Sequence, residues 1–245
     1  MKLLAPLLAL GQGFLSPGQS NRVANNHTVI NVSQLRISTC LWLLISLQFD
    51  DIPTQAGLAN VPSPYHHLNF DLYSVFKPDD PALEGMISKH DLNCAVSSPN
   101  ALVGSRLYEN GHGASFDIAN ATAMSLEGLQ PYFTLRSFYV KPMDAPAPGT
   151  TVYVKGYSKA KKEPLVWHID FPSGYHLPFL VKMEEYSGEE WNEVYKVEIT
   201  ADFGYDALDW EFCIDELEVQ FFALSEEEEE ARWERHAVLD HAEEI

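Results

Sequence analysis

The stretch "FCIDELEVQF", residues 212–221, has the alternating pattern of a β-strand but carries a carboxylate in its apolar row. Side chains of a strand point to opposite faces with a period of two. One face then carries Cys213, Asp215, Leu217, Val219 and Phe221. A carboxylate in a protein core needs hydrogen bonds or a positive charge as partner. Asp215 is therefore the residue of this strand that requires an explanation.

Comparable β-rich runs recur from residue 49 onward, with Gly and Pro residues between them. Six of them are "LNFDLYSVF" (68–76), "ASFDIA" (114–119), "YFTLRSFYV" (132–140), "TTVYVKGYS" (150–158), "PLVWHIDF" (164–171) and "NEVYKVEITADF" (192–203). Several short strands separated by turn signals are typical of a sandwich of two antiparallel sheets. We predict one all-β sandwich domain over residues 49–223.

The two ends of the chain differ from this domain. The opening "MKLLAPLLAL" has the charge-then-apolar layout of a secretory signal. Residues 1–48 show no sustained periodicity, so we predict a signal-like leader with a poorly ordered segment, of which residues 12–47 could stem from a gene-model error. Residues 224–245 contain five consecutive Glu residues and are predicted to be an acidic, mostly disordered tail. We expect a secreted, extracellular protein.

The charge of the chain excludes several kinds of partner. Its 245 residues carry a formal net charge of −19, which repels nucleic acids and anionic membranes. The apolar run in residues 1–10 and a second one from Cys40 to Leu47 are both too short to span a bilayer. We expect a monomer without a nucleic-acid partner and without a membrane span.

Cysteine residues and sequons offer a small set of covalent sites. The three cysteines are Cys40, Cys94 and Cys213, too few for a four-ligand zinc site. In a secreted chain the predicted disulfide is Cys94–Cys213, and two buried free thiols are the alternative. Asn120, in "NAT", is a predicted glycosylation site, as are Asn26 and Asn31.

The ordered strand series resembles a known group of sandwiches. It contains "FDDIP" (49–53), "YHHLNFDLYSVF" (65–76), "AVSSPNAL" (95–102) and "FCIDELEV" (212–219). In this order the runs resemble secreted jelly-roll β-sandwiches of galactose-binding-like and carbohydrate-binding-module type, in particular uncharacterised secreted proteins of filamentous fungi. The resemblance covers roughly residues 49–222 and concerns the fold, because this architecture hosts many functions.

The resemblance implies one answer for Asp215. In such jelly rolls the first and last strands lie side by side, and a structural calcium ion is often held between them by oxygen ligands. The implied ligands here are Asp50, Asp51, Asp215 and Glu216. The residues themselves leave another account open, in which Asp215 accepts backbone N–H bonds at a bulge. The alternation would then shift, so that Phe212 and Ile214 join Leu217 in the core.

Carbohydrate binding without catalysis is the function that we expect. Sugar rings stack on aromatic faces, and the candidate side chains are Tyr65, Trp167, Tyr175 and Trp191. A glycan or polysaccharide is the corresponding partner. Two alternatives are a jelly-roll glycoside hydrolase or lyase, which needs paired carboxylates in a cleft, and a structural or interaction protein of the cell surface. His168 and Asp170 share one strand face and are interpreted as a surface pair.

Overall fold

The computed structural model describes residues 42–107, 112–143, 149–204 and 210–225. The predictions for the signal-like start, for Cys40, for Asn26 and Asn31 and for residues 226–245 lie outside these ranges. The described residues form thirteen β-strands, two 3-10 helices and the short α-helices α1 (Ala121–Leu126) and α2 (Met183–Ser187). The fold is therefore all-β, as the sequence predicts.

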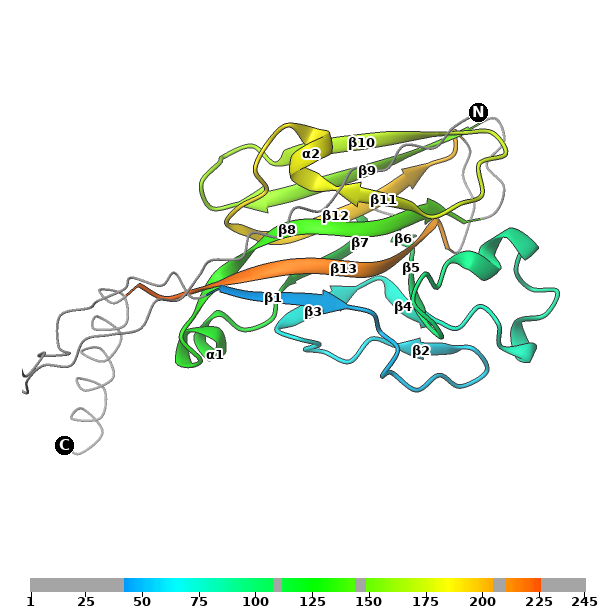
Figure 1. Ribbon diagram of the computed structural model, residues 1–245, viewed down its shortest axis with the longest axis horizontal. Coiled ribbons are helices and arrows are strands. Elements are labelled where there is room, and N and C mark those ends of the chain that lie inside the picture. Colours follow the sequence, from blue (N-terminus) through cyan, green and yellow to red (C-terminus); the bar gives the residue numbers. More distant parts are fainter. Residues whose placement is uncertain (1–41, 108–111, 144–148, 205–209, 226–245) are drawn as a thin grey trace, which may run out of the picture. The chain divides into compact units, whose positions relative to one another are not determined.

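The strands pair antiparallel in one hydrogen-bonded network that folds into two layers (Figure 1). The first layer consists of β10 (Leu165–Pro172), β9 (Gly149–Ser158), β12 (Val194–Asp202), β7 (His112–Ile118) and β3 (Leu68–Asp71), with β6 (Arg106–Leu107) on β7. The second layer consists of β11 (Phe179–Lys182), β8 (Leu129–Pro142), β13 (Phe212–Ala223), β1 (Trp42–Leu47), β5 (Ala101–Gly104), β4 (Tyr73–Phe76) and β2 (Leu58–Asn60). The paired residues Val194 and Phe133 connect the two layers.

The main core lies between the two layers. It joins buried side chains of the first layer, such as Val154 and Ile199, with those of the second, such as Phe133 and Val219. The rings of Phe116 and Phe133 stack across the interface with centroids 5.9 Å apart. Each large apolar side chain buried in this way stabilises the fold by about 2 kcal/mol.

A β-bulge at Glu216 explains why strand β13 can hold Asp215. Glu216 has a φ of 48°, and the pairing of β13 with β8 shifts between Asp215 and Glu218. One extra residue in a strand exchanges its two faces. The apolar residues on both sides of the bulge therefore all reach the main core: Phe212, Ile214, Leu217, Val219 and Phe221. The strictly alternating row was wrong, and the bulge that the residues also allowed is confirmed.

Strand β1 begins before the predicted start of the domain. It pairs with β13 from Trp42 opposite Phe222 to Leu47 opposite Leu217, and Leu47 is buried. The first and last strands lie side by side, as the resemblance implies (Figure 1). The domain boundary at residue 49 was wrong because "WLLISL" is a short apolar run after an aperiodic segment. Such a run does not by itself distinguish a strand from part of a leader.

Residues 77–100, which we call the cover segment, lie over the outer face of the second layer. The segment contains the 3-10 helices η2 (Pro81–Leu83) and η3 (Lys89–Asn93). A second apolar cluster forms between it and the sheet, made by Phe76, Leu83, Cys94, Ala101, Val103, Met143 and Cys213. Cys94 and Cys213 form a disulfide, with Cα atoms 5.9 Å apart. The outer face of β13 is thus buried at this end.

Candidate functional site

Protein donors occupy three of the four acidic side chains that the resemblance assigns to calcium: Asp50, Asp51 and Asp215. The Asp215 carboxylate is fully buried and accepts hydrogen bonds from the backbone N–H groups of Ser97 (2.8 Å) and Glu216 (2.7 Å). Asp50 accepts one from the N–H of Asn100 (2.8 Å). Asp50 and Asp215 therefore hold the same short turn, at residues 97–100.

These acids do not gather into a metal centre. The Asp51 carboxylate accepts a hydrogen bond from the Tyr65 hydroxyl (2.6 Å) instead of lying beside Asp215. Among the described residues, no group of three or more His, Cys, Asp or Glu side chains is placed to hold a metal ion. The hydrogen-bonding account of Asp215 fits this geometry, because Asp50, Asp51 and Asp215 each accept a hydrogen bond from a protein donor.

Burial changes the acidity of Asp215. Removal of the carboxylate from water raises the pKa of Asp215 to about 7, although the N–H donors of Glu216 and Ser97 act in the opposite direction. Near neutral pH this buried group therefore exchanges between its charged and neutral forms.

Two of the predicted sugar-stacking residues belong to the core. Trp191 is 1% exposed, and its indole N–H donates to the Ser187 hydroxyl (3.0 Å). The Trp191 ring fills the space beside Gly156, where an added Cβ would come within 2.6 Å of it. Tyr65 is buried against Phe49, with ring centroids 5.5 Å apart. Neither ring presents a face to solvent on which a sugar could stack, although Trp191 borders the groove described below.

The other two predicted aromatic residues are partly exposed at the edge of the sandwich. Trp167 of β10 stacks on Tyr186 of α2 with ring centroids 6.5 Å apart, and Tyr186 packs on Phe179 of β11. Tyr175 packs on Phe171, 5.5 Å away. Trp167, Tyr175 and Phe179 also pack against the main core. These rings are therefore held by their neighbours at the edge of the sandwich.

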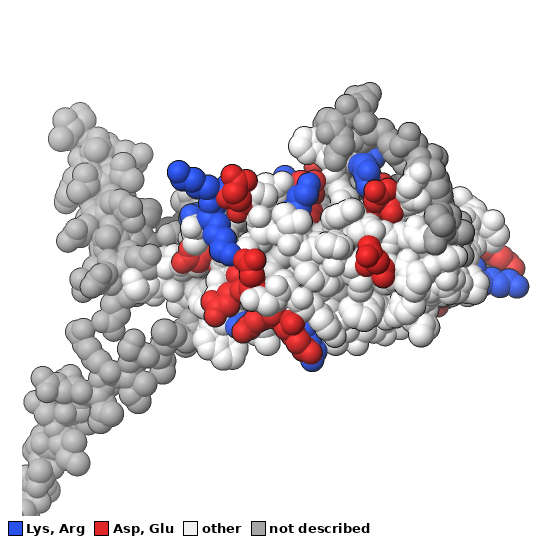
Figure 2. Space-filling view, turned by 90° about the horizontal axis from the view of Figure 1, so that it is seen from above, with Lys and Arg blue, Asp and Glu red and all other residues white. Residues whose placement is uncertain are grey.

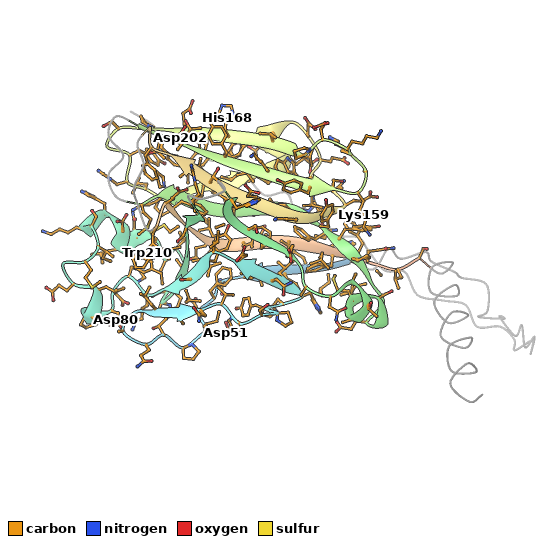
Figure 3. The ribbon with its side chains drawn as sticks, turned by 180° about the vertical axis from the view of Figure 1, so that it is seen from behind. Asp51, Asp80, Lys159, His168, Asp202 and Trp210 are labelled. Atoms are coloured by element: carbon orange, nitrogen blue, oxygen red, sulfur yellow. A yellow bond between two sulfur atoms is a disulfide. The ribbon has the colours of Figure 1, made fainter. Side chains whose placement is uncertain are left out.

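The remaining predicted polar sites lie apart from one another. His168 and Asp170 are exposed on β10, and Asp170 accepts a hydrogen bond from Thr151 (2.6 Å). Figure 3 shows His168 and Asp51 on opposite sides of the molecule, so they do not form a joint site. Asn120 is exposed and caps α1 by accepting a hydrogen bond from the N–H of Ala123.

A groove of about 530 Å³ lies on the outer face of the second layer, beside α2. It is lined by residues of β8, of the β11–α2 segment, of the approach to β12 and of β13: Thr134, Leu135, Arg136, Ser137, Lys182, Glu184, Glu185, Glu190, Trp191, Asn192 and Glu218. The polar residues of β13 reach this groove because they alternate with core residues: Val219 and Phe221 point inward, and Glu218 and Gln220 point outward.

Hydrogen bonds between neighbouring strands fix the side chains of the groove floor. The Arg136 Nε–H donates to Gln220 Oε1 (2.8 Å), and the Ser137 hydroxyl donates to Glu218 Oε2 (2.6 Å). Both bonds join β8 to β13, which are paired strands. The floor is therefore a rigid array of polar groups on a sheet.

One wall of the groove has a network of its own. The Thr134 hydroxyl donates to Asn192 Oδ1 (2.7 Å), and Asn192 Nδ2 donates to Glu190 Oε2 (2.7 Å). These bonds fix the orientation of the Asn192 amide. The groove thus presents hydroxyl, amide, guanidinium and carboxylate groups in fixed directions, which is the inventory needed to bind a polyhydroxylated molecule.

A row of three aromatic rings continues the groove floor toward the end of β13. Phe222 lies directly opposite Trp42 of β1, and its ring centroid is 6.3 Å from that of Tyr132 on β8. Figure 1 shows β1, β13 and β8 side by side. Trp42 is 57% exposed. The Lys159 ammonium lies 5.6 Å from the centroid of the Tyr132 ring. Figure 3 labels Lys159 near one end of the molecule.

Sequence reasoning missed this row and the groove. Trp42 lies in the segment that we assigned to the leader, and Phe222 and Tyr132 lie in strands where they were not distinguished from core residues. The alternation of the two strands offered a signal for the row. Phe221 and Phe133 point into the core, so their neighbours Phe222 and Tyr132 point to the outer face. The groove offered none, since it forms from four separate segments.

Comparison with known proteins yields structural likeness only. No family model matches the chain, and no curated protein matches it. A DUF4465 family protein from Bacteroides caccae is 13% identical, with a TM-score of 0.46, over 72% of this chain and 98% of its own. A DUF4465 family protein from Bacteroides ovatus is 10% identical, with a TM-score of 0.37, over 74% and 99%. The assignment of the sandwich therefore depends on the strand pairing above.

A search of the described residues for membrane spans finds no helix of sufficient length and apolarity.

Proposed function

We propose that this chain is a secreted, non-catalytic carbohydrate-binding module whose site is the outer face of β8 and β13. The observation that carries the proposal is the position of a partly exposed aromatic row beside a polar groove on one sheet face. The apolar face of a sugar ring packs on an aromatic ring, while its hydroxyl groups need donors and acceptors at the ring edge. The aromatic row offers rings for stacking, and the groove offers hydrogen-bond donors and acceptors.

The size and rigidity of the groove support the proposal. A volume of about 530 Å³ lies in the range of small-molecule sites. Arg136, Ser137 and Glu218 are carried by paired strands and held by hydrogen bonds. A site that is already ordered loses little conformational entropy when a ligand binds. The resemblance of the strand series to carbohydrate-binding jelly rolls and the disulfide, which is stable outside the reducing cytosol, are consistent with the proposal.

The charges of the groove favour a neutral glycan over an acidic one. Two acids are paired with cations, Arg136 with Glu184 (3.5 Å) and Lys182 with Glu185 (3.2 Å). Glu190 and Glu218 line the same groove, and no Lys or Arg of the described residues is within ion-pair distance of them. On the face of the molecule seen in Figure 2, acidic side chains lie next to basic ones and no single basic patch is visible. A uronic or sulfated sugar would meet uncompensated carboxylates here.

Binding of the full chain to an array of neutral and acidic glycans tests the proposal. Calorimetry then compares the wild type with Trp42→Ala on the strongest ligand. Loss of an exposed stacking ring should weaken binding about fivefold to tenfold. Tyr195→Ala is the matched control, because Tyr195 is 41% exposed on β12 in the other layer and should leave binding unchanged.

Two results would contradict the proposal. Failure of the full chain to bind any glycan, or equal losses from Trp42→Ala and Tyr195→Ala, would exclude this face as a sugar site. If chromatography detects shorter saccharides released from a bound polysaccharide, the result would instead favour the hydrolase or lyase alternative.

A further inference from the structure

The aromatic row and the polar groove lie at different points along β13. Phe222 belongs to the row, and Glu218 lines the groove four residues earlier. A strand rises about 3.3 Å per residue, so the two side chains are separated by about 13 Å along the strand. The site is therefore a strip and not a single pocket.

Polar side chains connect the two parts of the strip. Gln220 lies between Phe222 and Glu218 on the same outward face of β13, and it is only 7% exposed. Its neighbour across the β8 pairing is Thr134, which is 3% exposed. Both are hydrogen-bonded to groove residues, Gln220 to Arg136 (2.8 Å) and Thr134 to Asn192 (2.7 Å). A ligand that runs along β13 from the row to the groove therefore passes over these polar groups.

A single sugar ring does not reach both parts. A pyranose ring is about as large as the ring of Phe, and stacked rings lie with centroids about 4.5–7 Å apart. One ring packed on Phe222 and Trp42 therefore leaves the groove at Glu218 empty. About three linked rings are needed to cover the roughly 13 Å between them.

We infer that the ligand class is a linear oligosaccharide that lies along β13, with one unit on the aromatic row and the following units in the groove. This inference rests on the proposed carbohydrate-binding function. The unit on the row would contribute stacking on Trp42 and Phe222. The units in the groove would bond through their hydroxyl groups to Glu218, Arg136 and Asn192, whose remaining donors and acceptors face the groove. Affinity then depends on chain length, because only a long chain contacts both parts at once.

The test is a length series measured by calorimetry with the full chain. The probes are β-1,4-linked oligomers of glucose, N-acetylglucosamine, mannose and xylose, each from one to six units. The affinity for the oligomer type that binds should rise about tenfold between two and four units and then level off. A mono- or disaccharide that binds as tightly as the hexamer would overturn the inference while leaving carbohydrate binding intact. Absence of binding by all oligomers at every length would overturn both.

Two variants separate the ends of the strip. Trp42→Ala should remove the gain between two and four units and leave the affinity for the disaccharide unchanged. Glu218→Gln should weaken binding at every length by a similar factor, because the groove is occupied by short and long chains alike. Tyr195→Ala should reproduce the wild-type series. An equal loss at all lengths with Trp42→Ala would show that the row and the groove bind the same unit, and would overturn the inference.

Discussion

The outer faces of β8 and β13 differ sharply between their two ends. At one end the cover segment closes the face, and Cys213 and Asp215 are buried beneath it. At the other end Glu218 and Phe222 face a groove and an aromatic row. The same two strands therefore supply a sealed structural face and an open one. The bulge at Glu216 separates them, because it is the point where the faces of β13 exchange.

The two ends also differ in how far their polar side chains are satisfied by protein partners. Under the cover segment each buried charge has a partner: Lys141 contacts Asp91 at 2.8 Å, and the Asp215 carboxylate accepts backbone N–H bonds. In the groove the polar side chains keep donors and acceptors beyond those used by their neighbours. We therefore expect substitutions at the closed end to change stability and those at the open end to change binding.

The largest effect should come from Lys141→Met at the closed end. Lys141 and Asp91 are almost completely buried, and Lys141 also donates to Asn93 Oδ1 (3.0 Å) and to the His90 carbonyl. Removal of one charge leaves the other buried without its partner, which costs about 3–5 kcal/mol. The free energy of unfolding in denaturant measures the loss. The double variant Lys141→Met with Asp91→Leu should regain most of it, and a double variant as unstable as the single one would contradict this explanation.

Removal of the disulfide should have the next largest effect. Cys94 and Cys213 are 119 residues apart in the sequence, so their bond restricts a long loop in the unfolded chain. The variant Cys94→Ser with Cys213→Ser should lose about 2–4 kcal/mol of unfolding free energy. Reductant should lower the denaturation midpoint of the wild type and leave that of the variant unchanged. A wild type indifferent to reductant would mean that the two thiols are not bonded in solution.

Asp215→Asn should change the pH dependence of stability. Burial raises the pKa of Asp215 to about 7, whereas an unfolded aspartate titrates near pH 4. Between these values the folded protein retains a proton that the unfolded chain has lost. The contribution of this group is thus fully present below about pH 4 and is lost as the pH rises to about 7. Denaturant curves measure the unfolding free energy of the wild type and of Asp215→Asn at several pH values in this range. The wild-type value should fall relative to that of the variant as the pH rises. If the two unfolding free energies change with pH in the same way, the raised pKa of Asp215 is refuted.

The same variant also tests the calcium site that the resemblance implies. A calcium ion would need oxygen atoms of Asp215 that now accept N–H bonds from Ser97 and Glu216. Melting temperatures of the wild type and of Asp215→Asn, each with calcium and with chelator, decide the matter. A rise with calcium that Asp215→Asn abolishes would establish the ion, and equal temperatures in both conditions would leave only the hydrogen bonds.

The smallest effect on stability should come from Trp42→Ala at the open end. Trp42 is 57% exposed and lies at the start of β1. Substitutions at such surface positions usually change the unfolding free energy by less than about 0.5 kcal/mol. A denaturation midpoint close to that of the wild type would allow the binding loss expected for this variant to be attributed to the ring. A large drop in the midpoint would show that β1 depends on Trp42 for its docking.

The all-β fold was predictable because β-rich runs with period two are a local property of the sequence. Strand β9 shows it most clearly, with buried and partly exposed residues alternating from Gly149 to Ser158. The disulfide was predictable only as one of two alternatives, because the spacing of cysteines does not report which strands are neighbours. Trp191 was misassigned because a tryptophan after a polar loop has the same local pattern whether its ring faces solvent or Gly156.

By itself, the sequence determined the class of fold, the order of most strands and the acidic character of the chain, since these follow from residue type and periodicity over a few neighbours. Three features appear only in the folded molecule: β1 joins the sheet, Asp215 lies beneath the cover segment, and Trp42, Tyr132 and Phe222 form one row. Pairing partners and bulges are set by contacts between segments far apart in the sequence, such as Trp42 of β1 and Phe222 of β13. No local pattern carries that information.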